Sequence, residues 1–162
     1  MIEILNPYNQ GENMCFGCSQ NNPLGLKLKF AESDEYLLAS WSPGEYYQGY
    51  PNVLHGGIIS ALLDELAAWC VSVKAGTAGV TTEMNIRYLA PVYINKGDVS
   101  LKARITEQTE RNAKVHCQLF DSQSKICSEA MAVFFLYPPE VARRKFRYPG
   151  KEAFYPGNAD TV

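Results

Sequence analysis

Two groups of residues in one apolar stretch have the types and the spacing to carry out acyl transfer. His55-Gly56-Gly57 stands at the expected start of a helix, where glycines leave backbone N–H groups uncovered and the helix N-terminus attracts an anion or a developing oxyanion. Asp64 follows two turns later inside the apolar run, where a carboxylate is rarely kept without a partner or a task. As a set, these residues can hold an oxyanion and supply a nucleophile or a general base.

Each of these residues also has a simpler interpretation. Asp64 can be a solvent-facing or ion-paired helix residue, with Glu65 as its exposed neighbour. The two glycines can serve only to let a loop pass close to the sheet. A single histidine such as His55 is more often structural than catalytic.

The spacing of Gly57 and Asp64 makes a geometric argument. Seven residues apart, they lie on nearly the same helix face but about 10 Å apart along the axis. An amide and a carboxylate that act on one carbonyl group must be closer than this. Two antiparallel copies of the helix would bring Gly57 of one chain near Asp64 of the other, which predicts a site shared between two subunits.

The element that positions these residues is the stretch 54–74, the only long helix candidate. It is apolar nearly all round, as is typical of a helix in the middle of a protein. Asp64 and Glu65 interrupt it at its centre, which disfavours a membrane span. Gly76 is the expected terminator of the helix.

Six other segments have the apolar–polar alternation or the apolar content of strands. They are residues 25–31, 36–41, 80–89, 99–109, 114–121 and 126–137, and the last is expected to be the most central. Two strands, one helix and four strands predict an α+β fold, a six-stranded antiparallel sheet that curls around the helix. Such a layer leaves the other face of the sheet or the outer side of the helix exposed, and homodimerisation by pairing of edge strands would cover it. Residues 1–24 are expected to form a turn-rich lead-in, and residues 138–162 a partly irregular C-terminal extension after a domain that spans 1–137.

Length and composition limit the function classes. The chain of 162 residues has a net charge of −2, which fits one domain and argues against a nucleic-acid binder or strong adsorption to an anionic membrane. The first residues lack the basic start and long apolar centre of a secretory leader. Five cysteines, an odd number, suit a reducing cytoplasm. We therefore expect a cytoplasmic protein.

Cys15 and Cys18 form a single C-x-x-C motif in the lead-in. A zinc site would need two more ligands, and no second C-x-x-C or paired histidine follows. A redox pair is expected where a strand meets a helix, and no helical pattern follows here. Structural packing is therefore the preferred interpretation, with no metal and no cofactor, and a Cys15–Cys18 disulfide in the purified protein remains open.

Three motifs together resemble one known family. They are N-V-L-H-G-G-I-I-S-A-L-L-D-E at 52–65, T-T-E-M-N-I-R-Y-L-A-P-V at 81–92, and C-F-G-C-x-x-x-N-P-x-G-L at 15–26. They are similar to the HGG-motif, PaaI-like group of hotdog-fold acyl-CoA thioesterases of the phenylacetic-acid-pathway type. The resemblance covers residues 14–137 and implies a hotdog fold, in which the sheet wraps one long central helix.

The resemblance also implies roles for the residues of the helix. Asp64 would act as general base or nucleophile on a thioester. The Gly57 amide, near His55 and Gly56, would form the oxyanion hole. Thr81 would orient the water or the substrate.

Further candidates lie around these residues. Thr82 is the alternative to Thr81 if the register differs by one residue, and Asn52 can reach the site. Tyr47, Trp69 and Met84, with the nearby tyrosines 46 and 50, can shape an aryl or a medium-chain acyl pocket.

The phosphates of CoA need basic partners. The family often has Gly-Arg in the turn after its fourth strand, and here this turn reads Glu-Arg-Asn-Ala-Lys. Arg111 and Lys114 are the candidates in this turn. Residues 143–145 are a second basic cluster, although such a cluster is usually a solvated surface.

Three functions were compared for these residues. The first is an acyl-CoA thioesterase, a homodimer that can pair again into a tetramer. The second is a non-catalytic acyl-CoA or lipid-binding hotdog protein, since a fold does not fix a function. A hydratase is disfavoured because it needs a histidine paired with an acid, and the only other histidine, His116, lies on a predicted strand away from the helix.

Overall fold

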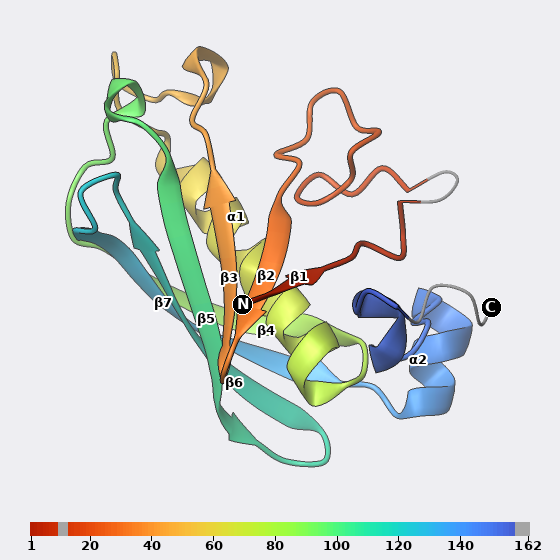
Figure 1. The fold of residues 1–162 in the computed structure, drawn as a ribbon. Coiled ribbons are helices and arrows are strands. Elements are labelled where there is room, and N and C mark those ends of the chain that lie inside the picture. The colour runs from red at the N-terminus through yellow and green to blue at the C-terminus, as the bar shows by residue number, and fades with distance from the viewer. Residues whose placement is uncertain (10–12, 158–162) are drawn as a thin grey trace.

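The computed structural model describes residues 1–9 and 13–157, and within them seven strands form one antiparallel sheet that curls around a long helix (Figure 1). The helix is α1 (Gly56–Cys70). The strands are β1 (Ile2–Ile4), β2 (Lys29–Ser33), β3 (Tyr36–Trp41), β4 (Gly79–Tyr88), β5 (Val99–Gln108), β6 (Asn112–Phe120) and β7 (Ile126–Leu136). The predicted α+β fold is confirmed, with seven strands in place of six.

The additional strand is β1, which pairs with β2 from the predicted lead-in. Three residues are too short to show an alternation, so no sequence pattern indicates this strand. The next predicted strand is displaced: Leu26 and Leu28 are buried as expected, but their amides bond to the carbonyls of Phe16 and Gly17 in the lead-in. Ladder pairing with β3 begins only at Lys29.

The strand order is β1-β2-β3-β5-β6-β7-β4. The expectation that residues 126–137 form the most central strand was wrong, because β5 is the middle strand and β7 is next to the last. The apolar content of β7 reflects burial of its helix-facing side chains, such as Ala132 and Phe134, and not its rank in the sheet. The outermost position on this side belongs to β4, which leaves one long edge of the sheet unpaired within the chain.

Helix α1 packs along five strands, β3 to β7, which explains its nearly uniform apolar character. After Cys70 it continues as one π-helical turn over Val71–Ala75 and stops at Gly76, whose φ of 71° is the left-handed terminator that the sequence predicted. By length and composition, Gly56–Ala75 would be able to cross a membrane, but half of this segment is buried inside the fold.

The C-terminal segment packs against the second half of α1. Helix α2 (Pro139–Phe146) is followed by a 3-10 turn over Lys151–Phe154, and both lie beside the end of α1 in Figure 1. The Phe154 ring is fully buried, 5.5 Å from the Trp69 ring in an edge-to-face arrangement. Its carbonyl accepts a hydrogen bond from the Leu5 amide, so the two ends of the described chain meet here.

We predict that Phe154→Ala lowers the free energy of unfolding by about 3 to 5 kcal/mol, because it empties a fully buried site next to Trp69. Urea denaturation followed by circular dichroism measures the loss. Phe146→Ala is the matched control: this phenylalanine is 37% exposed, and its removal should cost about 1 kcal/mol or less. Equal losses in the two variants would show that the C-terminal segment does not stabilise the core.

Candidate active site

Asp64 projects from α1 toward the edge strand β4. The Thr81 hydroxyl donates a hydrogen bond of 2.8 Å to Asp64 Oδ1. Thr81 stands opposite the fully buried Phe134 in the ladder, on the helix-facing side of the sheet. A bulge follows at Thr82, whose hydroxyl donates to the Val133 carbonyl instead. Of the two neighbouring threonines, the structure therefore brings Thr81 to the carboxylate.

The start of α1 is organised by His55. This residue is the N-cap, and its Nδ1 accepts the Gly57 N–H at 2.9 Å. The Gly57 amide is therefore not bare in this structure, contrary to the expectation for the two glycines. For Gly57 to donate to a substrate, the imidazole has to turn away.

Tyr88 is a residue of this region that the sequence analysis missed. Its hydroxyl lies 2.6 Å from the Ser60 hydroxyl and donates to the Gly56 carbonyl at 3.2 Å. The signal was present in the alternation of β4: beyond the bulge, Met84, Ile86 and Tyr88 alternate onto the helix-facing side. Edge strand β4 thus holds α1 at two places, at Asp64 and at the first helical turn.

A hollow of 310 Å³ opens beside the helix start. It is lined by Gly56 and Tyr88 together with apolar side chains, which include Ile59, Leu89 and Val92. Met84 lies nearby on the helix-facing side of β4 and packs against the core. Apolar walls next to a polar helix start are typical of a site that binds a ligand with an apolar body and a polar end.

Asn52 and Tyr47 support the loop before the helix and do not contact Asp64. Asn52 adopts a left-handed conformation with φ of 64°, and its amide group exchanges two hydrogen bonds with Asn95, of 2.9 and 3.2 Å. Tyr47 packs edge-on against Trp41 at 5.2 Å, and its carbonyl accepts the His55 amide. Both residues therefore fix where the helix begins.

Three other candidates lie apart from Asp64. Trp69 is on another face of α1, stacked on Phe30 at 4.3 Å. Lys114 faces the outer side of the sheet and pairs with Glu107 at 2.8 Å. Arg111 is exposed in the turn between β5 and β6, where its carbonyl accepts the Leu136 amide.

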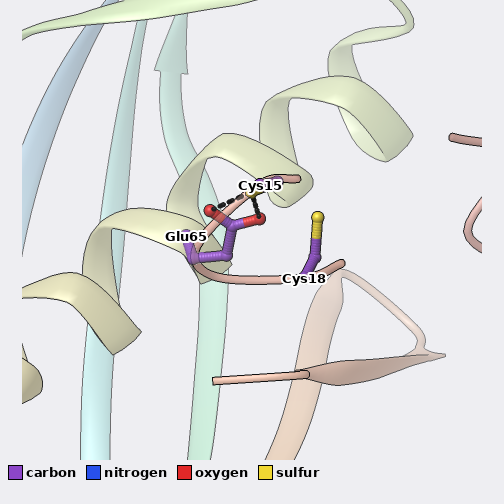
Figure 2. Close-up of side chains that lie close together, drawn as sticks. All are labelled: Cys15, Cys18 and Glu65. Carbon is purple, nitrogen blue, oxygen red and sulfur yellow. Dashed lines mark hydrogen bonds between the residues drawn. The ribbon is translucent and has the colours of Figure 1, made fainter. Parts of the chain in front are cut away.

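Glu65 is half-buried and is not the exposed neighbour that the simpler interpretation of Asp64 assumed. Its carboxylate meets the C-x-x-C loop of the lead-in, and Cys15 Sγ lies 3.4 and 3.6 Å from its two oxygens (Figure 2). Trp69 Nε1 donates to Glu65 Oε1 at 3.0 Å. The two cysteines and Glu65 are about 50 positions apart in sequence, so spacing rules could not bring them together.

Burial raises the pKa of Glu65 to about 7, and the neighbouring charge of Cys15 adds to this effect. Interaction with the Cys18 thiol lowers the pKa of Cys15 to about 5, and the same interaction together with burial raises the pKa of Cys18. All five cysteines of the chain are free thiols in this structure.

Known proteins resemble this chain in sequence and in fold. The family model described as Thioesterase superfamily matches residues 51–128, which include His55, Asp64, Thr81 and Tyr88. A curated relative, the uncharacterized mitochondrial membrane protein FMP10 of Saccharomyces cerevisiae, is 24% identical over 134 residues, 78% of this chain and 54% of its own length. This chain thus spans about half the length of that relative.

Solved structures identify the fold as the hotdog fold. The PaaI protein from the phenylacetic acid degradation operon of Escherichia coli is 17% identical, with a TM-score of 0.64 over 70% of this chain and 82% of its own. The smu.793 protein of Streptococcus mutans, solved with acetyl-CoA bound, is 18% identical with a TM-score of 0.63 over 69% and 90%. Thioesterase HI1161 of Haemophilus influenzae is 19% identical, with a TM-score of 0.64 over 69% of this chain and 79% of its own.

We predict that His55→Ala lowers the free energy of unfolding by about 1 kcal/mol, because it removes the side chain that caps the Gly57 amide. Urea denaturation measures the change. His116→Ala is the control, since His116 is half-exposed on β6 and lies 3.9 Å from Glu129 in a weak ion pair. If His55→Ala were no less stable than the control, the imidazole would not be acting as the helix cap.

Proposed function

We propose that this protein hydrolyses an acyl-CoA thioester to a free acid and CoA. The observation that carries the proposal is the Asp64–Thr81 pair, a carboxylate held by a hydroxyl on a sheet edge next to a glycine-rich helix start. The match to the Thioesterase superfamily over 51–128 supports it, as do similar folds that were solved with acetyl-CoA or CoA bound. The free thiols fit a protein of a reducing compartment.

In the proposed reaction, Asp64 and the Thr81 hydroxyl hold a water molecule against the thioester carbonyl carbon. Asp64 takes a proton as the water oxygen attacks, and the carbonyl oxygen becomes an oxyanion. The amides of Gly57 and Gly56 stabilise this oxyanion once the His55 imidazole has turned from Gly57. The C–S bond then breaks, and the proton passes from Asp64 to the departing CoA sulfur. Direct attack by Asp64 through an anhydride is the variant that uses the same groups.

We further propose that the site is completed by a second copy of the chain. Strand β4 is ten residues long and stands at the edge of the sheet, a surface that pairs readily with another strand. An antiparallel pair of β4 strands centred near Met84 and Asn85 places Thr81 opposite Tyr88 of the partner subunit. Because Thr81 holds Asp64 and Tyr88 holds Gly56, this register brings each carboxylate toward the other subunit's helix start.

The acyl group would enter the apolar hollow lined by Ile59, Tyr88 and Leu89, with Met84 beside it. Arg111 and Lys114 remain the proposed contacts of the CoA phosphates. Both are exposed or partly exposed near the start of β6, in the same region of the sheet as Thr81, whose ladder partner Phe134 pairs with Ala113.

We predict that Asp64→Asn lowers kcat for thiol release by about 10² to 10⁴-fold, because the amide cannot accept a proton. A panel of acyl- and aryl-CoA substrates with a thiol-reactive dye measures the rate. Asp121→Asn is the matched control, since its amide oxygen can still accept the Gln123 and Lys125 amides in the β6–β7 turn. Equal rates for Asp64→Asn and the control would remove Asp64 from the mechanism. Tight CoA binding without hydrolysis of any substrate would favour the non-catalytic binder.

We predict that two inactive variants restore activity when they are mixed. Gly57→Pro removes the amide proton at the second helical residue, where proline is tolerated, and Asp64→Asn removes the base. In a mixed dimer with shared sites, one of the two sites keeps both groups, so random mixing should restore about a quarter of the wild-type activity. Unfolding and refolding the two chains together, followed by the thiol assay, measures the recovery.

The control for this experiment is each inactive variant refolded alone, together with the mixture before unfolding. These samples should stay inactive, because their dimers contain one kind of chain. A refolded mixture that shows mixed dimers by mass spectrometry yet no recovered activity would show that Gly57 and Asp64 of one chain act together.

A further inference from the structure

The C-x-x-C loop of the lead-in is built around the Glu65 carboxylate. Cys15 and Cys18 lie beside it, as Figure 2 shows, and Gly17 between them comes close to its side chain. A Cβ atom at Gly17 would lie 2.3 Å from Glu65 Cδ, so a larger residue here would have to displace the Glu65 side chain from its place in the cluster. The loop is also held by the following segment, because the Leu26 and Leu28 amides donate to the carbonyls of Phe16 and Gly17. The proposed hydrolysis uses none of these groups.

This cluster consists of acidic groups, and Arg147 is the basic residue that lines the same pocket. Within the described residues, no lysine, arginine or histidine forms an ion pair with Glu65. A carboxylate and two thiols share a largely buried place beside Trp69, where charged groups are normally paired or bound to a metal. A bound divalent cation would supply the missing charge.

The distances fit tetrahedral coordination. One ligand atom from each of Cys15, Cys18 and Glu65 lies within 4.8 Å of the other two. In a tetrahedral zinc site with bonds of about 2.3 Å to sulfur and about 2.1 Å to oxygen, neighbouring sulfur and oxygen ligands are about 3.6 Å apart. The observed separations of Cys15 Sγ from the Glu65 oxygens are 3.4 and 3.6 Å. Only small movements would be needed to close the three ligands on an ion.

The surroundings of the cluster supply what a metal site needs beyond its ligands. Trp69 Nε1 donates to Glu65 Oε1 and fixes the orientation of the carboxylate. A pocket of 720 Å³, lined by Tyr8, Asn13 and the three cluster residues, opens next to it. Asn13 Nδ2 is buried and has no hydrogen-bond partner among the described residues. A water or anion at a fourth coordination position would give this amide an acceptor.

We propose that Cys15, Cys18 and Glu65 bind one thiophilic divalent cation of the zinc type, with a fourth position open to the pocket. As the bonds from the metal to sulfur and oxygen form, the protons that Cys15, Cys18 and Glu65 still carry are released to solvent. The site fastens the lead-in to α1 one residue after Asp64. The sequence interpretation lacked two ligands for such a site, and the fold supplies one from the central helix while the pocket leaves room for a solvent ligand.

Cobalt(II) is the probe that tests this proposal. The full-length protein is reduced, stripped with a chelator and titrated with Co²⁺ without oxygen. We expect one Co²⁺ per chain, a thiolate-to-cobalt charge-transfer band in the near ultraviolet, the visible bands of tetrahedral cobalt, and loss of these bands on addition of Zn²⁺. Zn²⁺ should also raise Tm, because it binds the folded chain.

Single variants distinguish ligands from neighbours. Cys15→Ser, Cys18→Ser and Glu65→Gln should each bind Co²⁺ about 100-fold more weakly or worse, and Trp69→Phe about 10-fold more weakly, because it loses the bond that orients Glu65. Asp64→Asn, the adjacent acid on the other side of the helix, should bind as the wild type does. Circular dichroism of each metal-free variant establishes that it is folded.

Three results would overturn the proposal. The first is a reduced wild-type protein that takes up no stoichiometric Co²⁺ or Zn²⁺. The second is a folded Cys15→Ser, Cys18→Ser or Glu65→Gln variant that binds Co²⁺ as tightly as the wild type does. The third is recovery of a Cys15–Cys18 disulfide with no metal from cells lysed under alkylating conditions, which would identify the motif as a redox pair.

Discussion

The burial of one apolar helix inside a curled sheet is the constraint on which the rest of this structure depends. Five strands pack along α1, so the helix has few directions left in which a polar side chain can point. Asp64 and Glu65 are neighbours in sequence, and successive helix residues are turned by about 100°. One acid therefore meets the edge strand β4, and the other meets the lead-in loop. The two adjacent acids therefore belong to two separate clusters of side chains.

The position of β4 explains why the candidate active site lies at an edge. The chain crosses from β3 through α1 to the far side of the sheet, and β7 pairs with β4 from one side only. The free side of β4 exposes Thr81 and the residues around it to a possible partner. In our proposal, the same feature that leaves the sheet open also supplies the second half of the site, since helix start and carboxylate are about 10 Å apart within one chain.

The region around Glu65 depends on contacts between distant parts of the chain. The lead-in closes over the carboxylate from one side, while Trp69 holds it from the helix and is itself covered by Phe30 and Phe154. The first and last described segments are thereby tied to the middle of α1. A cation in this cluster would act on the orientation of the helix residue next to Asp64, so the two regions are connected through one turn of backbone.

The sequence alone determined the elements that depend on local pattern. The apolar helix, its end at Gly76, the alternating strands and the α+β layer follow from periodicity and from glycine's tolerance of positive φ. The resemblance implied that a hydroxyl at Thr81, or at Thr82, orients the water or the substrate, and the structure brings Thr81 to the Asp64 carboxylate. The short strand β1 was not predicted, because three residues are too few to show an apolar–polar alternation.

Only the tertiary structure decided which groups meet across long separations. The bulge at Thr82 selects Thr81, and the crossover of α1 puts β4 and not β7 at the edge. Glu65 and Cys15 meet across 50 residues because the loop folds onto the helix, which no spacing rule can express. Whether the Gly57 amide is free or hydrogen-bonded also depends on the rotamer of His55, whose Nδ1 accepts it here. Local sequence sets local geometry, while the partner of a buried polar group is set by whatever the rest of the chain packs against it.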